Sequence, residues 1–175
     1  MKTLTDQLSQ YAAYHRDLRN IVTHFIGIPM IVLAVAVLLA RPVFAQWGGV
    51  SLSPATGVTL AVVVYWIRLD LRLGAVMAGL MGLALWVAQS VALQPTATWL
   101  AAGIGLFVVG WVFQFIGHWY EGRKPAFVDD LVGLVIGPLF VVAEAAFMMG
   151  LRRPLQQAIE SRVGPVRGGS ARHRA

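Results

Sequence analysis

Three histidines and two carboxylates are the residues of this sequence whose chemistry suggests a metal site. His15, His24 and His118 each lie near the polar end of an apolar segment, and Glu121 and Glu144 accompany them. The sequence has no cysteine, which excludes zinc–thiolate sites, iron–sulfur clusters and cysteine nucleophiles. Histidine with carboxylate suits non-haem Fe(II), Mn(II) or Zn(II), and three such ligands with open positions describe an oxygen-activating iron site. We therefore expect the three histidines to be the metal-binding and catalytic residues, with the two glutamates as further candidate ligands.

His118 lies in the stretch WVFQFIGHWYEGRKP, where an apolar run ends in charge. On a helix, Gln114, His118 and Glu121 share one face, because residues three and four apart are neighbours there. Taken alone, this stretch is better explained by an ordinary interfacial belt of aromatic and basic residues, and the rest of the chain is what favours a site. If the histidines bind a metal, Gln114, Tyr11 and Asn20 are expected to form hydrogen bonds that fix the imidazole tautomers.

The spacing of the two N-terminal histidines restricts the structure. His15 and His24 are nine residues apart, so one straight helix would place them about 180° from each other. The apolar spacing predicts an amphipathic surface helix over residues 3–18, followed by a new helix from about Asn20. A shared metal site therefore requires a bend between Arg16 and Asn20.

The composition is that of an integral membrane protein. Hydrophobic residues make up 58% of the chain and charged residues only 13%. We expect an all-α, polytopic membrane helical bundle of four to five hydrophobic segments behind the N-terminal amphipathic helix, with the first segment, the last or both broken by proline. The apolar runs are residues 21–40 (with Pro29), 55–67, 73–93, 97–117 and 131–151 (with Pro138), and the RLDLR link between the second and third is short enough for a tight helical hairpin.

The basic residues suggest how the chain is oriented. The net charge is +6, and six of the fourteen basic residues follow Gly150. We expect residues 1–151 to form a single integral-membrane helical domain and residues 152–175 to form a disordered cytoplasmic tail that contacts anionic lipid rather than nucleic acid. His173 lies in that tail and is not expected to bind the metal. The positive-inside rule then places the other three histidines at the cytoplasmic face.

Several enzyme classes are excluded by missing motifs. The sequence has no HExxH, no glycine-rich phosphate loop and no nucleophile elbow, and it has too few histidines for a membrane desaturase. Two alternatives to an enzyme remain: a small metal-ion or proton carrier that uses the same histidines, and a non-catalytic membrane structural protein. A carrier needs polar groups along the whole path across the membrane, whereas here they gather at one face with only Glu144 deeper. This distribution favours the enzyme.

The arrangement of these residues resembles a known family. The shared segments are Tyr11-x-x-Tyr14-His15, Asn20-x-x-x-His24-x-x-x-x-Pro29 and Trp111-x-Phe113-Gln114-Phe115-x-Gly117-His118, followed by Pro125-Ala126, Asp130, Pro138 and Glu144. They cover roughly residues 8–30 and 110–147. The combination resembles the fungal and bacterial membrane 2-hydroxy fatty acid dioxygenases of the α-oxidation pathway.

The resemblance implies an enzyme with an Fe²⁺ cofactor that uses O₂ to shorten a 2-hydroxy fatty acid by one carbon. It implies that His15, His24 and His118 hold the iron, that the acyl chain lies between apolar helices beside membrane lipid, and that basic residues guide the substrate carboxylate. The candidates for that last role are Arg16, Arg19, Arg123 and Lys124. We expect the enzyme in the inner membrane of a bacterium, or in the endoplasmic reticulum if the source is eukaryotic.

Overall fold

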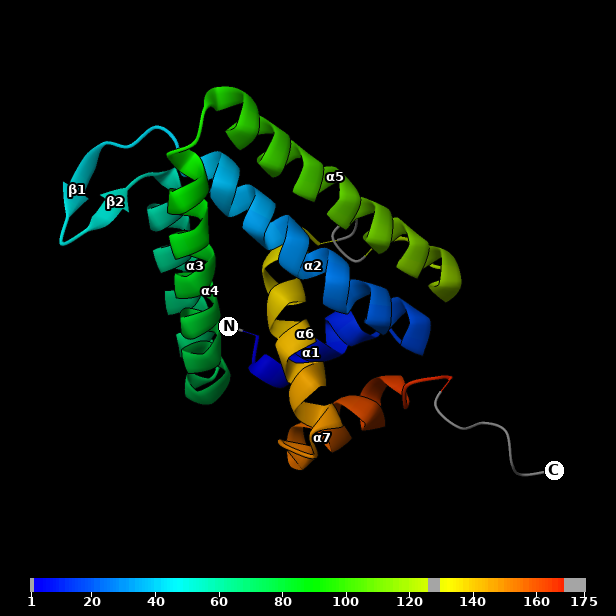
Figure 1. The fold of residues 1–175 in the computed structure, drawn as a ribbon. Coiled ribbons are helices and arrows are strands. Elements are labelled where there is room, and N and C mark those ends of the chain that lie inside the picture. The colour runs from blue at the N-terminus through cyan, green and yellow to red at the C-terminus, as the bar shows by residue number, and fades with distance from the viewer. Residues whose placement is uncertain (1, 126–129, 169–175) are drawn as a thin grey trace. The chain divides into compact units, whose positions relative to one another are not determined.

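The structure is a computed structural model that describes residues 2–125 and 130–168. Within these residues the chain forms helices and one small β-hairpin, which confirms the all-α prediction (Figure 1). The elements are α1 (Leu4–Ala12), α2 (Leu18–Leu39), β1 (Ala45–Trp47), β2 (Val50–Leu52), α3 (Pro54–Leu69), α4 (Leu71–Ala92), α5 (Thr96–Glu121), α6 (Gly133–Met148) and α7 (Arg153–Val163).

Three helices of the described chain are long and apolar enough to cross a membrane: α2, α4 and α5, with 22, 22 and 26 residues. Helices α6 and α7 together would supply a fourth span, although they are bent by 113° at a short break. Helix α3 has only 16 residues, about 24 Å, which is shorter than the hydrocarbon core of a bilayer. The apolar helices fit the expected membrane protein.

The chain divides into two compact units. One consists of residues 1–28 and 112–175 and is called the terminal unit here, because it contains both ends of the chain; the other, residues 29–111, is called the central unit.

In the terminal unit, α1 begins with a capping box. The Thr3 hydroxyl accepts a hydrogen bond from the Asp6 amide, and the Asp6 carboxylate accepts one from the Thr3 amide. The helix ends at Ala12, six residues earlier than predicted, and the amides of Tyr14 and His15 donate to the carbonyls of Tyr11 and Ala12. These i to i−3 bonds tighten the last turn and release the chain from the helix. His15 therefore lies in the link between α1 and α2.

The break in the last apolar segment follows Met148. Pro29 and Pro138 both lie inside helices, α2 and α6. The chain turns instead at residues 149–152, where Gly150 and Arg152 have φ angles of 74° and 55°. Only glycine adopts such angles without strain, so the left-handed Arg152 is the strained residue of this turn.

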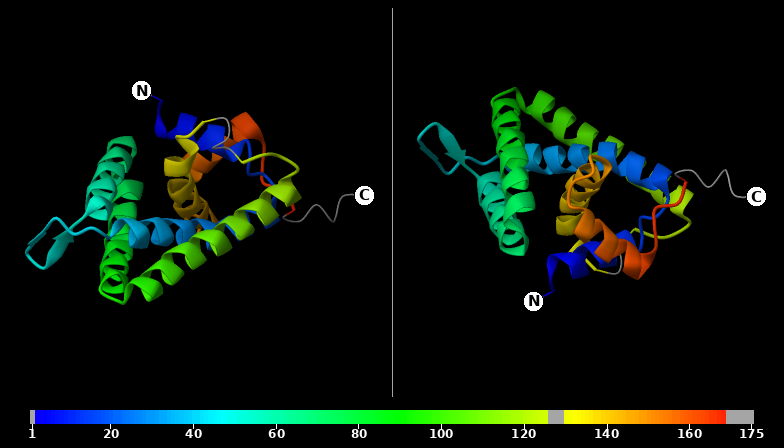
Figure 2. Two further views of the ribbon diagram at one scale, coloured as in Figure 1. Left: turned by 90° about the horizontal axis from the view of Figure 1, so that it is seen from above. Right: turned by 90° about the horizontal axis from the view of Figure 1, so that it is seen from below.

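Helix α7 corrects the expectation of a disordered tail. Residues 153–163 are helical, and α7 lies against α1 in both views of Figure 2. Leu155 and Ile159, four residues apart, form the buried stripe of α7, and Arg162 pairs with Asp6 at 2.8 Å. The i, i+4 spacing of these two apolar side chains could have predicted a helix here. The high arginine content of the segment instead led to the prediction of a disordered tail. Residues 169–175, including His173, lie outside the described part.

The central unit contains the predicted helical hairpin. Helices α3 and α4 are separated only by Asp70, whose carboxylate caps α4 by accepting from the Leu73 amide at 2.9 Å. A Cβ on Gly74 would lie 2.6 Å from the Ile67 backbone, so glycine is required where the two helices meet. Small side chains form the core of this unit, among them Val37, Ala55 and Ala88.

Candidate metal centre

His15 is held in the link after α1 by its own preceding turn. Its Nδ1 lies 2.7 Å from the Tyr11 carbonyl oxygen, and its ring stacks on the Tyr11 ring at 4.1 Å with an interplanar angle of 3°. Phe140 of α6 lies against both rings. The His15 side chain is fully buried. Burial, and then the neighbouring His24, lower the pKa of His15 well below its ordinary value, so the imidazole is neutral, as a metal ligand must be.

His24 lies in the second turn of α2 and is also fully buried. Its Nδ1 lies 2.8 Å from the Asn20 carbonyl oxygen. A carbonyl oxygen can only accept, so Nδ1 carries the proton in His24, and by the same reasoning in His15. In both neutral rings Nε2 is then a bare acceptor.

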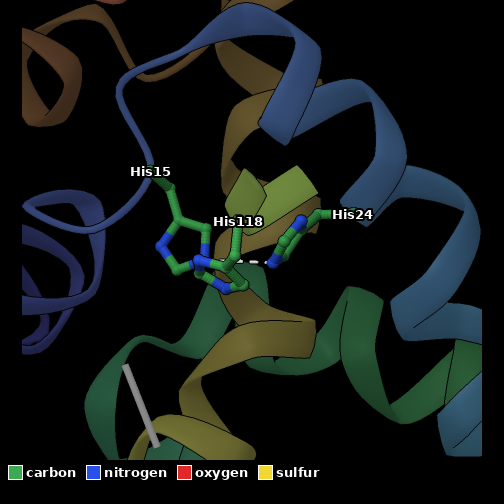
Figure 3. Close-up of side chains that lie close together, drawn as sticks. All are labelled: His15, His24 and His118. Carbon is green, nitrogen blue, oxygen red and sulfur yellow. Dashed lines mark hydrogen bonds between the residues drawn. The ribbon is translucent and has the colours of Figure 1, made fainter. Parts of the chain in front are cut away.

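These two bare nitrogens face each other. His15 Nε2 and His24 Nε2 are 3.0 Å apart (Figure 3). Neither can donate to the other while both rings are neutral, so the pair is unfavourable until a cation binds between the two nitrogens. Ligands about 2.1 Å from one ion and at right angles are about 3.0 Å apart, which matches the observed separation.

His118 completes the group from the last turn of α5. Its ring centroid lies 4.9 Å from that of His15 and 5.0 Å from that of His24, and each pair meets edge to face. Figure 3 shows the three side chains converging. One ligand nitrogen from each residue lies within 4.8 Å of the others, and His118 Nδ1 is buried without a hydrogen-bond partner among the described residues. The spacing, the burial and the unused nitrogen fit a metal ion.

Glu121 is buried one turn after His118, but its carboxylate is occupied elsewhere. One oxygen accepts from the backbone amides of Arg16 and Asp17, at 2.9 and 2.7 Å, and from Asn20 Nδ2 at 3.0 Å. The other oxygen pairs with Arg167 at 2.6 Å. Glu121 thus fixes the link that carries His15 to the start of α2. The described metal-binding group contains the three histidines and neither glutamate.

Glu144 of α6 pairs with Arg16. The two are 3.3 Å apart and both are buried. The Arg16 Nε also donates to the carbonyls of Ala12 and His15, at 2.9 Å each. A lone carboxylate at this depth would be costly, and the arginine offsets that cost. Glu144 therefore stabilises the turn next to His15 through Arg16.

The basic residues expected to guide a carboxylate differ in how exposed they are to solvent. Arg16 is buried against Glu144, and Arg19 pairs with Asp17 at 2.8 Å. Arg123 is exposed and donates to the Ala13 carbonyl at 3.0 Å, and Lys124 is exposed as well. The two residues after α5 are thus the more accessible candidates.

The three expected hydrogen-bond partners of the histidines behave differently. Tyr11 and Asn20 accept from His15 and His24, but through backbone carbonyls rather than side chains. Gln114 lies one turn before His118 on α5, and its side-chain Nε2 has no partner among the described residues. The hydrogen bonds expected of Tyr11 and Asn20 are thus present through backbone atoms, whereas no bond from Gln114 to a histidine is described.

Two features of the site were not assigned a role from the sequence. A Cβ on Gly117 would lie 2.2 Å from Thr23 Oγ1 and 2.4 Å from Asn20 Oδ1, so only glycine lets α5 approach α2 at this point. Arg167, far along the chain, also donates its backbone amide to the Arg16 carbonyl and accepts from the Leu18 amide. In the sequence, the position of Gly117 directly before His118 was one indication of its role. Nothing in the sequence indicated the role of Arg167.

The chain is similar to known proteins over most of its length. A model of the family described as 2-hydroxy-palmitic acid dioxygenase Mpo1-like matches residues 1–149, which include all three histidines. The chain is also 33% identical over 159 residues to the 2-hydroxy-palmitic acid dioxygenase MPO1 of Saccharomyces cerevisiae, covering 90% of this chain and 87% of the yeast protein. No solved structure matches the chain significantly. The family match, which contains the whole of α1 to α6, shows that the chain belongs to the Mpo1-like family.

Proposed function

We propose that the protein is an Fe(II)-dependent dioxygenase that uses O₂ to shorten 2-hydroxy fatty acids by one carbon. The observation that carries the proposal is the pair of bare Nε2 atoms of His15 and His24, 3.0 Å apart beside His118. Family membership supports the substrate class, because the yeast relative is named a 2-hydroxy-palmitic acid dioxygenase.

The protein contributes neutral imidazoles to the site. When bound, Fe(II) would supply open coordination positions and the redox chemistry that O₂ requires. Three neutral histidines add no negative charge, so an anionic 2-hydroxy acid head group is favoured beside the positively charged ion. Arg123 and Lys124 are exposed just after α5 and would steer that carboxylate towards the site.

The surroundings of the histidines control orientation and water. The carbonyls of Tyr11 and Asn20 hold the two Nδ1 protons, so each Nε2 stays directed inward. The stacked Tyr11 ring and Phe140 cover His15 and exclude water from one side. The acyl chain would lie against apolar helices, where each buried methylene contributes about 0.8 kcal/mol.

We place the reaction at the cytoplasmic face of the membrane, in a bacterial inner membrane or, for a eukaryotic source, in the endoplasmic reticulum. The apolar helices α2, α4 and α5 support the membrane assignment. The basic residues near the site and the positive-inside rule support the choice of face.

The test uses detergent-purified protein loaded with Fe(II) and supplied with 2-hydroxyhexadecanoate. We expect O₂ uptake and, by mass spectrometry, a product one carbon shorter that carries label from ¹⁸O₂. Protein loaded with Zn(II) should consume no O₂, because Zn(II) has no redox chemistry. Metal-dependent flux in liposomes without O₂ consumption would instead identify a carrier and overturn the proposal.

A further inference from the structure

Gln114 has a buried side-chain nitrogen without a hydrogen-bond partner among the described residues. The residue is only 6% exposed. A buried N–H donor without an acceptor is destabilising, and such a group in a native protein calls for an explanation, of which a ligand is one. Gln114 lies four residues before His118 on α5, so both side chains leave the same face of the helix.

Asn20 supplies a matching unused acceptor. Its Nδ2 donates to the Tyr14 carbonyl at 3.2 Å and to Glu121 at 3.0 Å. Both partners can only accept, which fixes the orientation of the amide and leaves Oδ1 as the free atom. Asn20 is fully buried, and Oδ1 has no partner in the described part of the chain.

Asn20 Oδ1 lies at the crossing of α2 and α5, and Gln114 belongs to the same stretch of α5. Asn20 Oδ1 lies against α5 at Gly117, because a Cβ there would be 2.4 Å away from it. Gln114 is three residues before Gly117, and His118 follows directly. A buried donor from α5 and a buried acceptor from α2 thus lie beside the histidines.

We propose that Gln114 Nε2 and Asn20 Oδ1 bind the 2-hydroxyl group of the substrate and select for it. A hydroxyl both accepts and donates, whereas a carboxylate oxygen only accepts and a methylene does neither. A site built to hydrogen-bond a hydroxyl discriminates strongly against the analogue that lacks it, because its buried polar groups are then left unpaired. This inference rests on the proposed function and names the feature of the substrate that the site recognises.

The test compares two ligands in two proteins. Binding of 2-hydroxyhexadecanoate and of hexadecanoate is measured by calorimetry, without O₂, on the metal-loaded protein and on Gln114→Met, which keeps the side-chain length and removes the amide. The variant should bind 2-hydroxyhexadecanoate about tenfold more weakly, as expected for one lost hydrogen bond to a ligand, and should bind hexadecanoate unchanged. Its melting temperature should stay the same or rise, because an unsatisfied buried group has been removed.

A structural role for Gln114 would give the opposite pattern. Gln114→Met would then lower the melting temperature and weaken the binding of both ligands equally, and this result would overturn the inference. An unchanged preference of the variant for the hydroxy acid would overturn it as well. Gln114→Leu provides a second variant with the same expected outcome. Ser9→Ala is the matched control, because Ser9 Oγ on α1 is also buried without a described partner. It should change neither affinity.

Failure of the proposed function would be seen separately. If the unaltered protein neither binds 2-hydroxyhexadecanoate nor consumes O₂ with it, both proposals fall. If it turns over normally and Gln114→Met keeps the full preference for the hydroxy acid, only the role of Gln114 is contradicted.

Discussion

His15 Nε2 and His24 Nε2 are 3.0 Å apart although each ring donates its only proton, through Nδ1, to a backbone carbonyl. The fold thus holds two acceptors together, and Glu121 stabilises this arrangement by accepting from the Arg16 and Asp17 amides in the link between them. Such a pair is stabilised by a cation and not by a second proton, because burial opposes charging His15.

Glu121→Gln tests whether this residue positions His15. An amide has a single acceptor oxygen, and its NH₂ group would face either Arg167 or the backbone amides that Glu121 now satisfies. We expect a 10- to 100-fold loss of metal affinity, the range typical for groups that orient ligands, measured by competition with a chelator. Amide hydrogen exchange at Arg16 and Asp17 should accelerate.

Glu160→Gln is the control for that experiment. In the described structure, the Glu160 side chain accepts from Gln156 within α7 and lies outside the histidine group. Unchanged metal affinity and unchanged exchange in Glu121→Gln would show that the carboxylate does not hold the link.

The ion pair of Arg167 with Glu121 indicates that the segment after α7 stabilises the site. Truncation after Gly150 would be harmless if that segment were only a charged tail, but the structure pairs Arg167 with the buried Glu121. Arg167→Ala should lower both the melting temperature and the metal affinity. The loss in free energy of unfolding should be only about 1 kcal/mol, because the arginine side chain is largely exposed. A chain ending at Gly168 should have the same melting temperature and metal affinity as the full chain. If a chain ending at Gly150 also had the same values as the full chain, this role would be contradicted.

Gly117→Ala tests the close approach of α5 to α2. The new methyl group would meet Thr23 Oγ1 and Asn20 Oδ1, at 2.2 and 2.4 Å, with His24 Nδ1 at 3.1 Å. We expect a destabilisation of about 1–3 kcal/mol in thermal unfolding, together with weaker metal binding, because His24 must shift. Gly105→Ala, where a Cβ would meet nothing within 4 Å, should be neutral or slightly stabilising. Equal stability of the two variants would refute the tight crossing.

The contact of α1 with α7 should depend on pH. The Arg162 guanidinium, and then the Thr3 hydrogen bonds, hold the pKa of Asp6 below its ordinary value of 3.8. A lowered pKa in the folded state means that the stabilisation is complete above pH 3.8 and is lost as the pH falls through the lower folded value. Melting temperatures of the protein and of Asp6→Asn should therefore converge in acid. A constant difference between them would contradict the ion pair.

The sequence predicted the parts of the site that depend on local spacing. Nine residues between His15 and His24 required a break, and the chain breaks at residues 13–17, beginning three residues before the bend predicted between Arg16 and Asn20. The roles of Glu121 and Arg167 depend on long-range contacts. Glu121 is 105 residues from Arg16, and Arg167 is 46 residues from Glu121, so no local sequence pattern predicts either contact. Helix α7 had a local signal in the spacing of Leu155 and Ile159, but their burial against α1 depends on contacts between the two ends of the chain, which one segment does not show.

Metal content measured on purified protein tests the central claim most directly. After purification and reconstitution with Fe(II), we expect one iron per chain, and His15→Ala, His24→Ala and His118→Ala should each lose it, because each removes one ligand of the buried group. His173→Ala, the fourth histidine of the sequence, should retain full occupancy. Full iron occupancy in any of the first three variants would contradict the metal centre described here.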